Sequence, residues 1–121
     1  MKSIYASNII FQGTYRDYNF AIREIHNYYC AYVLPKTNIN HLSTSSDSLD
    51  DIPCHCYISW VGPMENLFND KSCIGWDYGH VCDEEIIYSQ EYVLADIFKV
   101  IDYLINTAEL DLKECEFDAN N

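Results

Sequence analysis

The sequence predicts an α+β fold, in which an antiparallel sheet of four to five strands, built from two hairpins, packs against one long C-terminal amphipathic helix. Two regions are rich in aromatic and β-branched residues, as strands are. One later region repeats apolar residues at spacings of three and four, as a helix on a core does. With 121 residues, 49% of them hydrophobic, the chain is expected to form a single domain over residues 1–121.

The first hairpin is predicted between residues 18 and 34. Tyr18, Phe20 and Ile22 fall on one side of an extended chain, as a half-buried strand requires. His26-Asn27 can form a tight turn, and the aromatic and β-branched run at 29–34 stops at a proline. These residues therefore predict two adjacent strands.

A polar loop and a second hairpin are expected next. Residues 36–51 gather Asn, Ser, Thr and Asp, which favour turns, so we expect this loop not to pack. Residues 56–60 and 73–78 are predicted as the two strands of the second hairpin. Gly62-Pro63 and Asn69-Asp70 are expected in the connection between them.

The clearest element is a helix near residues 90–106. Ser89 is a suitable N-cap, and Glu91 lies in the first turn, where the helix dipole favours an anion. The predicted apolar stripe consists of Leu94, Ile97, Phe98, Ile101, Leu104 and Ile105. The opposite face is expected to present Asp96, Lys99 and Asp102 to water, and the acidic tail 109–121 to fray.

Charge is the most unusual feature of the composition. The chain holds 19 acidic and 7 basic residues, a formal net charge of −12. Such a charge repels nucleic acid and anionic membrane and attracts basic protein surfaces. The candidate contacts with a basic partner are Asp50, Asp51, Asp83, Glu84, Glu85, Glu109, Asp111, Glu114 and Glu116. A highly soluble acidic protein with no charged partner is the alternative.

Eleven tyrosines accompany the acidic residues. Tyrosine is enriched at protein interfaces, so the sequence predicts an acidic, tyrosine-rich binding face, and the aromatic surplus makes a homodimer plausible. The alternative is that the tyrosines lie half-buried around a small sheet.

Six cysteines and the absence of a long apolar run indicate the compartment. We expect no signal peptide and no membrane span, and therefore an intracellular protein with free thiols, several of them buried. Cys54, Cys56, His80 and Cys82 have the ligand types of a zinc site, but buried thiols without a ligand are the favoured interpretation.

A second candidate site combines His55, Asp77, His80 and Asp83. If the two segments converge, two imidazoles and two carboxylates could hold a divalent metal, or place a general base beside an acid. The structural alternative is that Asp77 or Asp83 caps the loop after a strand, while His80 hydrogen-bonds backbone carbonyls.

The segment with Gly75, Trp76, Asp77, His80 and Asp83 resembles a family of uncharacterised small phage and prophage proteins that carry a Gly-(Phe/Trp)-Asp-x-x-His-x-x-Asp motif. Residues 30–36 and 91–93 resemble two further stretches of that family. Cys56 and Tyr57 stand where the family has two glycines. The resemblance implies a phage or mobile-element context and names no activity.

Two functions follow as expectations. The first is a non-enzymatic counter-defence protein, similar in role to an anti-CRISPR inhibitor, acting in the host cytoplasm without a cofactor. It would cover the nucleic-acid-binding site of a basic host protein, for example a CRISPR effector, and would not itself bind nucleic acid or membrane. The second is a small enzyme or ligand-binding protein that holds a divalent metal at the His/Asp cluster.

Overall fold

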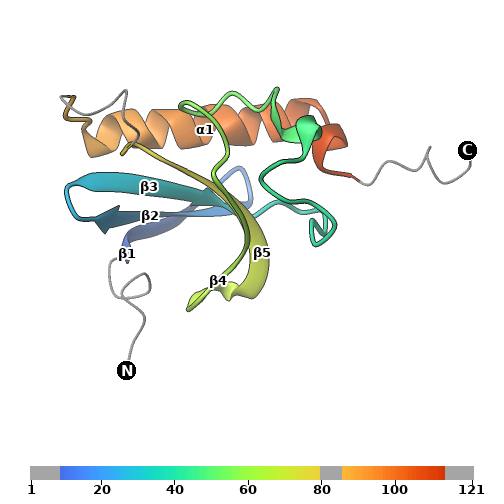
Figure 1. Ribbon diagram of the computed structural model, residues 1–121, viewed down its shortest axis with the longest axis horizontal. Helices are drawn as coiled ribbons and strands as arrows, with labels where there is room; N and C mark the ends of the chain where they lie inside the picture. The colour runs from blue at the N-terminus through green and yellow to red at the C-terminus, as the bar shows by residue number, and fades with distance from the viewer. Residues whose placement is uncertain (1–8, 80–85, 114–121) are drawn as a thin grey trace, which may run out of the picture.

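The protein is an α+β fold with one helix lying across one face of a five-stranded antiparallel sheet (Figure 1). The computed structural model describes residues 9–79 and 86–113. The sheet order is β1-β2-β3-β5-β4. The elements are β1 (Ile9–Tyr15), β2 (Tyr18–Ile25), β3 (Tyr28–Val33), the 3-10 helix η2 (Asp47–Leu49), β4 (Trp60–Met64), β5 (Leu67–Asp77), α1 (Gln90–Asn106) and the 3-10 helix η4 (Leu110–Leu112).

The hairpin between β2 and β3 confirms the first prediction. Phe20 pairs with Val33 and Ile25 pairs with Tyr28, so residues 26–27 form the whole turn. His26 adopts a positive φ of 56°, which the turn requires. The predicted and observed strands differ by only one or two residues at their ends.

The strand β1 was not predicted. It pairs with β2 through a two-residue turn at Arg16 and Asp17, whose φ angles are 50° and 73°. Two-residue hairpins need positive φ at these places and usually recruit Gly or Asn there. The turn chemistry of Arg16-Asp17 therefore gave no hairpin signal.

The prediction for the second hairpin was wrong in its first strand. The strand spans 60–64 rather than 56–60, and the turn consists of Glu65 and Asn66. Gly62-Pro63 lies inside β4 and Asn69-Asp70 inside β5, not in the connection. Because β4 is an edge strand, a proline can sit there without removing an interior ladder hydrogen bond.

The main core lies between α1 and the sheet. On the helix, Val93, Ile97, Val100, Ile101 and Leu104 are fully buried. They face alternate strand residues, among them Ile22, Ile74 and Trp76. The N-cap prediction is confirmed, because the Ser89 hydroxyl accepts a hydrogen bond of 3.1 Å from the backbone N–H of Tyr92.

A second apolar cluster occupies the opposite face of the sheet. It contains Ala21, Tyr32, Met64, Leu67 and Cys73. β5 bends along its length, so that the β4–β5 hairpin projects away from α1 (Figure 1). The hairpin thereby covers a face that the single helix leaves open.

The polar segments before β4 and after α1 pack more closely than predicted. Within the 36–51 loop, Ile39 and Leu49 are buried in the main core. Leu112 is fully buried in η4, so the predicted fraying of 109–121 is wrong for 109–113. A few apolar residues are enough to anchor a polar segment. Residues 114–121 lie outside the described residues.

Neither α1 nor any other helix within 9–79 and 86–113 has the length and apolar composition needed to cross a membrane.

Candidate protein-interaction surface

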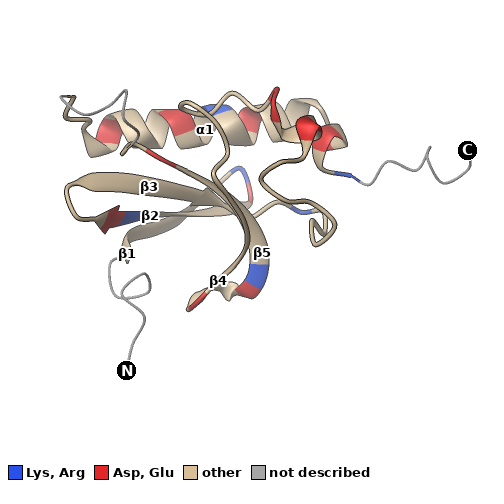
Figure 2. Ribbon diagram, viewed as in Figure 1, with Lys and Arg blue, Asp and Glu red and all other residues tan. Residues whose placement is uncertain are grey.

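Acidic residues gather on the helix side of the molecule. The segments that carry α1, η2 and η4 (43–54 and 86–113) hold eight acids and two bases, a net charge of −6. The sheet and its loops (9–42 and 55–79) hold five acids and four bases, a net charge of −1. Figure 2 marks in red the acidic residues along α1 and in the two short helices. The negative charge of the described residues is therefore polarised toward the helix layer.

One of these acids is internal. Asp96 is 7% exposed and accepts a 2.6 Å hydrogen bond from the hydroxyl of Tyr78, which in turn accepts one from Nε1 of Trp76. Lys99 Nζ lies 3.7 Å from the other carboxylate oxygen. The prediction that Asp96 faces water is wrong, because its hydrogen bonds replace water. Burial, together with the bond to Asp96, raises the pKa of Tyr78 far above its usual value.

Glu109 is also internal, and this corrects its assignment as a partner contact. It is 3% exposed, and its carboxylate accepts hydrogen bonds from the Tyr18 hydroxyl (2.6 Å) and from the backbone N–H groups of Lys36 and Thr37 (both 2.8 Å). Although burial acts to raise it, these hydrogen bonds lower the pKa of Glu109. The residue joins the end of α1 to the start of the long loop.

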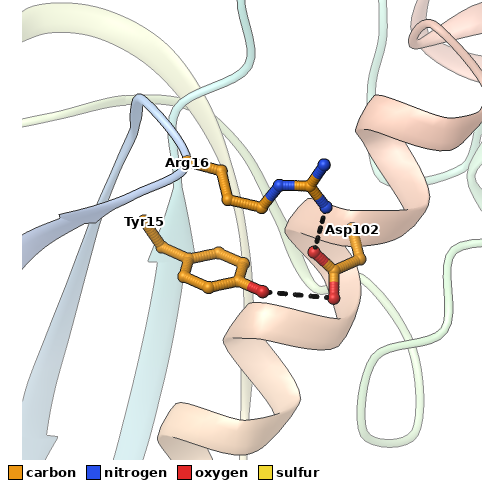
Figure 3. Close-up of polar contacts among 3 residues, drawn as sticks. All are labelled: Tyr15, Arg16 and Asp102. Atoms are coloured by element: carbon orange, nitrogen blue, oxygen red, sulfur yellow. Dashed lines mark hydrogen bonds and ion pairs between the residues drawn. The ribbon is translucent and has the colours of Figure 1, made fainter.

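Asp102 links α1 to the β1–β2 turn. Its carboxylate lies 2.8 Å from Nη1 of Arg16 and accepts a 3.4 Å hydrogen bond from the Tyr15 hydroxyl (Figure 3). The Arg16 and Asp102 side chains are 48% and 39% exposed, so this is a surface ion pair. It offsets one negative charge of the helix layer.

Apart from the internal Asp96 and Glu109, the acids of the helix layer form what we call the acidic face. Asp50 and Asp51 are exposed, as contact with a partner requires, and Asp111 is half-buried and accepts a hydrogen bond from the Tyr103 hydroxyl. The acidic face consists of Asp47, Asp50, Asp51, Glu91, Asp102 and Asp111. The other predicted contacts, Asp83, Glu84, Glu85, Glu114 and Glu116, lie outside the described residues.

An aromatic cluster lies at the N-terminal end of α1. The rings of His55 and Tyr78 stack at 4.5 Å, Tyr78 and Tyr88 are 5.2 Å apart, and Tyr88 and Tyr92 stack at 5.1 Å. Tyr92 is 47% exposed. Ring pairs of this kind are rigid and contribute beyond the area they bury.

Large apolar side chains on nearby segments of the chain are also exposed. They are Tyr57, Ile86 and Ile87, of which Ile87 is 97% exposed. Other tyrosines behave as the alternative predicts, since Tyr18, Tyr32 and Tyr78 are buried around the sheet. The candidate interface therefore uses only a minority of the described tyrosines, and no local pattern in the sequence distinguishes them from the others.

The proposed metal residues that are described lie in different surroundings. His55 belongs to the aromatic cluster. Asp77 lines a cavity of about 150 Å³ on the other face of the sheet, with Arg23 and Cys30. It accepts hydrogen bonds from the Ser59 hydroxyl (3.2 Å) and from the N–H of Gly79 (2.9 Å). The second bond is the loop contact that the structural alternative predicts.

Among the described residues, no three His, Cys, Asp or Glu side chains are grouped as metal ligands would be. His80 and Asp83, which complete the predicted cluster, lie outside the described residues, as does Cys82. Cys30, Cys54 and Cys73 are free thiols. Burial raises the pKa of Cys30 and of Cys73 to about 12, so both remain protonated.

In comparisons with protein-family models, with curated proteins and with solved structures, nothing matches this chain.

Proposed function

We propose that this protein is a counter-defence protein of a phage or mobile element, which binds a basic, nucleic-acid-binding surface of a host protein. The acidic face would occupy the place of the phosphate backbone. A CRISPR effector is one host protein with such a surface. The observation that carries the proposal is that the six carboxylates of the acidic face lie on the helix side of the sheet, in segments whose described residues include only two bases, Lys99 and Lys113.

The one-sided distribution of acidic residues favours a role in binding a partner over the alternative that the charge only keeps the protein soluble. An acidic protein that only needs to stay soluble gains nothing from gathering its carboxylates on one side. A one-sided field steers a cationic surface toward α1 and raises the association rate. It also predicts that binding weakens as salt is added, because exposed charges are screened over about 10 Å at 0.1 M salt.

The aromatic cluster supplies what charge alone does not. Interfaces owe most of their binding energy to a few anchors, and tyrosine is enriched among them. Tyr92 and Ile87 are exposed, and the acidic Glu91 directly precedes Tyr92 in the chain. An arginine of the partner can place its guanidinium over a tyrosine ring and near a carboxylate at once.

The mobile-element context rests on the resemblance described above, at Gly75, Trp76 and Asp77. A protein of that origin acts inside the host cell, so the proposed location is the host cytoplasm. The proposal needs no cofactor and no direct contact with nucleic acid or membrane, and it leaves room for a homodimer.

The first test is affinity capture from a host lysate at low and high salt, followed by competition. The proposal expects a basic, nucleic-acid-binding protein at low salt, released at high salt and displaced by that protein's own nucleic acid. Recovery of partners that nucleic acid does not displace would contradict it.

Elemental analysis of the same preparation tests the other hypothesis, a divalent metal held by His55, Asp77, His80 and Asp83. A stoichiometric metal lost in the His55→Ala variant would favour an enzyme or ligand-binding protein. It would count against the inhibitor proposal if capture also failed.

A further inference from the structure

A groove on the sheet face opposite α1 has the features of a ligand site. It has a volume of about 670 Å³, within the range of roughly 300–1,000 Å³ common for ligand pockets. β1 and β2 form one wall, and the tip of the β4–β5 hairpin forms the other. The acidic face lies on the helix side of the sheet, so this groove is a separate feature.

The polar lining of the groove is rich in carboxamides. Gln12 and Ala21 are paired across β1 and β2, as are Thr14 and Asn19, so their side chains share one face of the sheet. Six exposed polar side chains line the groove: Gln12, Thr14, Asn19, Asn66, Asn69 and Asp70. Within residues 9–79 and 86–113, none of the six makes a side-chain hydrogen bond. Their donors and acceptors are available to a ligand.

The hairpin wall contains unusual backbone. Phe68, Asn69 and Asp70 are all left-handed, with φ of 56°, 55° and 62°. Such a conformation costs an ordinary residue such as Phe68 about 1–2 kcal/mol, whereas asparagine and aspartate adopt it more readily. The hairpin does not require it, because Glu65 and Asn66 already join the paired residues Met64 and Leu67.

The extra residues form a bulge. Pro63 pairs with Ser72, so residues 68–71 are inserted between the Leu67 pair and the Ser72 pair. The bulge directs Asn69 and Asp70 to the groove and leaves Phe68 half-buried at its wall. Strained backbone that a hairpin turn does not require is found most often where it shapes a binding site.

The chemistry of the lining selects a class of ligand. The groove has no lysine or arginine and one carboxylate, so a phosphate or other anion finds no counter-charge. Carboxamides and a hydroxyl both donate and accept hydrogen bonds, as vicinal sugar hydroxyls do. The ring of Phe68 offers apolar surface to the C–H face of a pyranose ring. We propose that this groove binds a neutral saccharide.

The test is a titration of ¹⁵N-labelled protein, followed by amide NMR, with maltose, lactose, cellobiose and chitobiose at millimolar concentration. The proposal expects at least one sugar to shift the amides of residues 12–14, 19 and 66–70 in a saturable manner. Amides of α1 should not move.

Two variants and a control complete the design. Asn19→Ala combined with Asn69→Gly removes one carboxamide from each wall without adding backbone strain, and Gln12→Ala removes a third carboxamide from the β1–β2 wall. Each is expected to weaken binding at least severalfold while the spectrum stays dispersed. Asn106→Ala, an exposed helix position, should change nothing. The proposal is overturned if no sugar shifts these amides, or if both groove variants bind as the unaltered protein does.

Discussion

The Tyr18 hydroxyl donates a 2.6 Å hydrogen bond to the carboxylate of Glu109, a residue 91 positions away in the chain. Two backbone N–H groups bind the same carboxylate, and the side chain is almost fully buried. An acid from the predicted flexible tail is thus a fixed part of the fold. Acidic residues that stabilise the fold are therefore tested by unfolding, and acidic residues that contact a partner are tested by binding.

Replacing Glu109 with glutamine is expected to destabilise the fold by roughly 2–4 kcal/mol. The amide NH₂ cannot accept a hydrogen bond, so at least one of the three donors would lose its partner in a buried place. The free energy of unfolding in urea measures this. Glu91→Gln, at an exposed position on α1, is the matched control and should change stability by less than about 0.5 kcal/mol.

Glu109 also predicts the direction of the pH dependence. Its hydrogen bonds hold its pKa in the folded state below the ordinary 4.5 of the unfolded chain. The stabilisation is therefore complete above pH 4.5 and is lost as the pH falls through the lower folded value. Urea unfolding at a series of pH values should show that the difference in the free energy of unfolding between the unaltered protein and Glu109→Gln becomes smaller in acid. A difference in unfolding free energy that grows as the pH falls would contradict this account.

Asp102 should behave differently from Glu109, although it too bridges distant elements. Its ion pair with Arg16 is exposed to water, and such pairs contribute about 0.2–1 kcal/mol. Asp102→Asn is therefore expected to cost less than about 1 kcal/mol, and less still at high salt. A loss equal to that of Glu109→Gln would show that this surface contact holds α1 to the sheet.

The thiols should differ in reactivity. Cys30 and Cys73 are buried, and burial raises the pKa of each to about 12, whereas Cys56 is exposed. Because the thiolate is the reactive form, iodoacetamide at neutral pH should modify Cys56 in the folded protein and reach Cys30 and Cys73 only in urea. Peptide mass spectrometry reports each site. Equal labelling of all three in the folded protein would mean that the sheet opens readily.

The spacing of apolar residues along the chain correctly predicted the elements whose side-chain pattern is set by their own backbone. The alternation of buried and exposed side chains along β2 and the apolar spacing along α1 follow from the strand and helix periods. The turn at 26–27 was predicted from its residue types. β1 was missed because its turn uses Arg16 and Asp17, which carry no glycine or asparagine signal. β4 was misplaced because Gly62-Pro63 is typical of a turn, and only the sheet order reveals an edge strand.

The sequence predicts that the candidate site is acidic, but it does not predict which acidic residues lie on the surface. The acid excess is visible in the sequence, yet Asp96 and Glu109 are internal because of Tyr78 and Tyr18, which only the folded chain brings to them. The groove could not be predicted from the sequence, since one wall comes from β1 and β2 and the other from residues 66–70. Contacts between segments far apart in the chain cannot be inferred from spacing alone.

The most direct test of the central claim compares two triple variants of equal charge. Asp47→Asn with Asp50→Asn and Asp51→Asn removes three carboxylates from the acidic face. Glu24→Gln with Glu65→Gln and Asp70→Asn removes three exposed carboxylates from the sheet side. Each changes the net charge from −12 to −9.

The measurement is the salt dependence of binding to the captured host protein. The account predicts that the acidic-face variant binds at least tenfold more weakly at low salt, with a shallower salt dependence, because three charge contacts are gone. The sheet variant should bind as the unaltered protein does. Equal weakening in both variants would mean that net charge alone drives binding, and would contradict a directed acidic face.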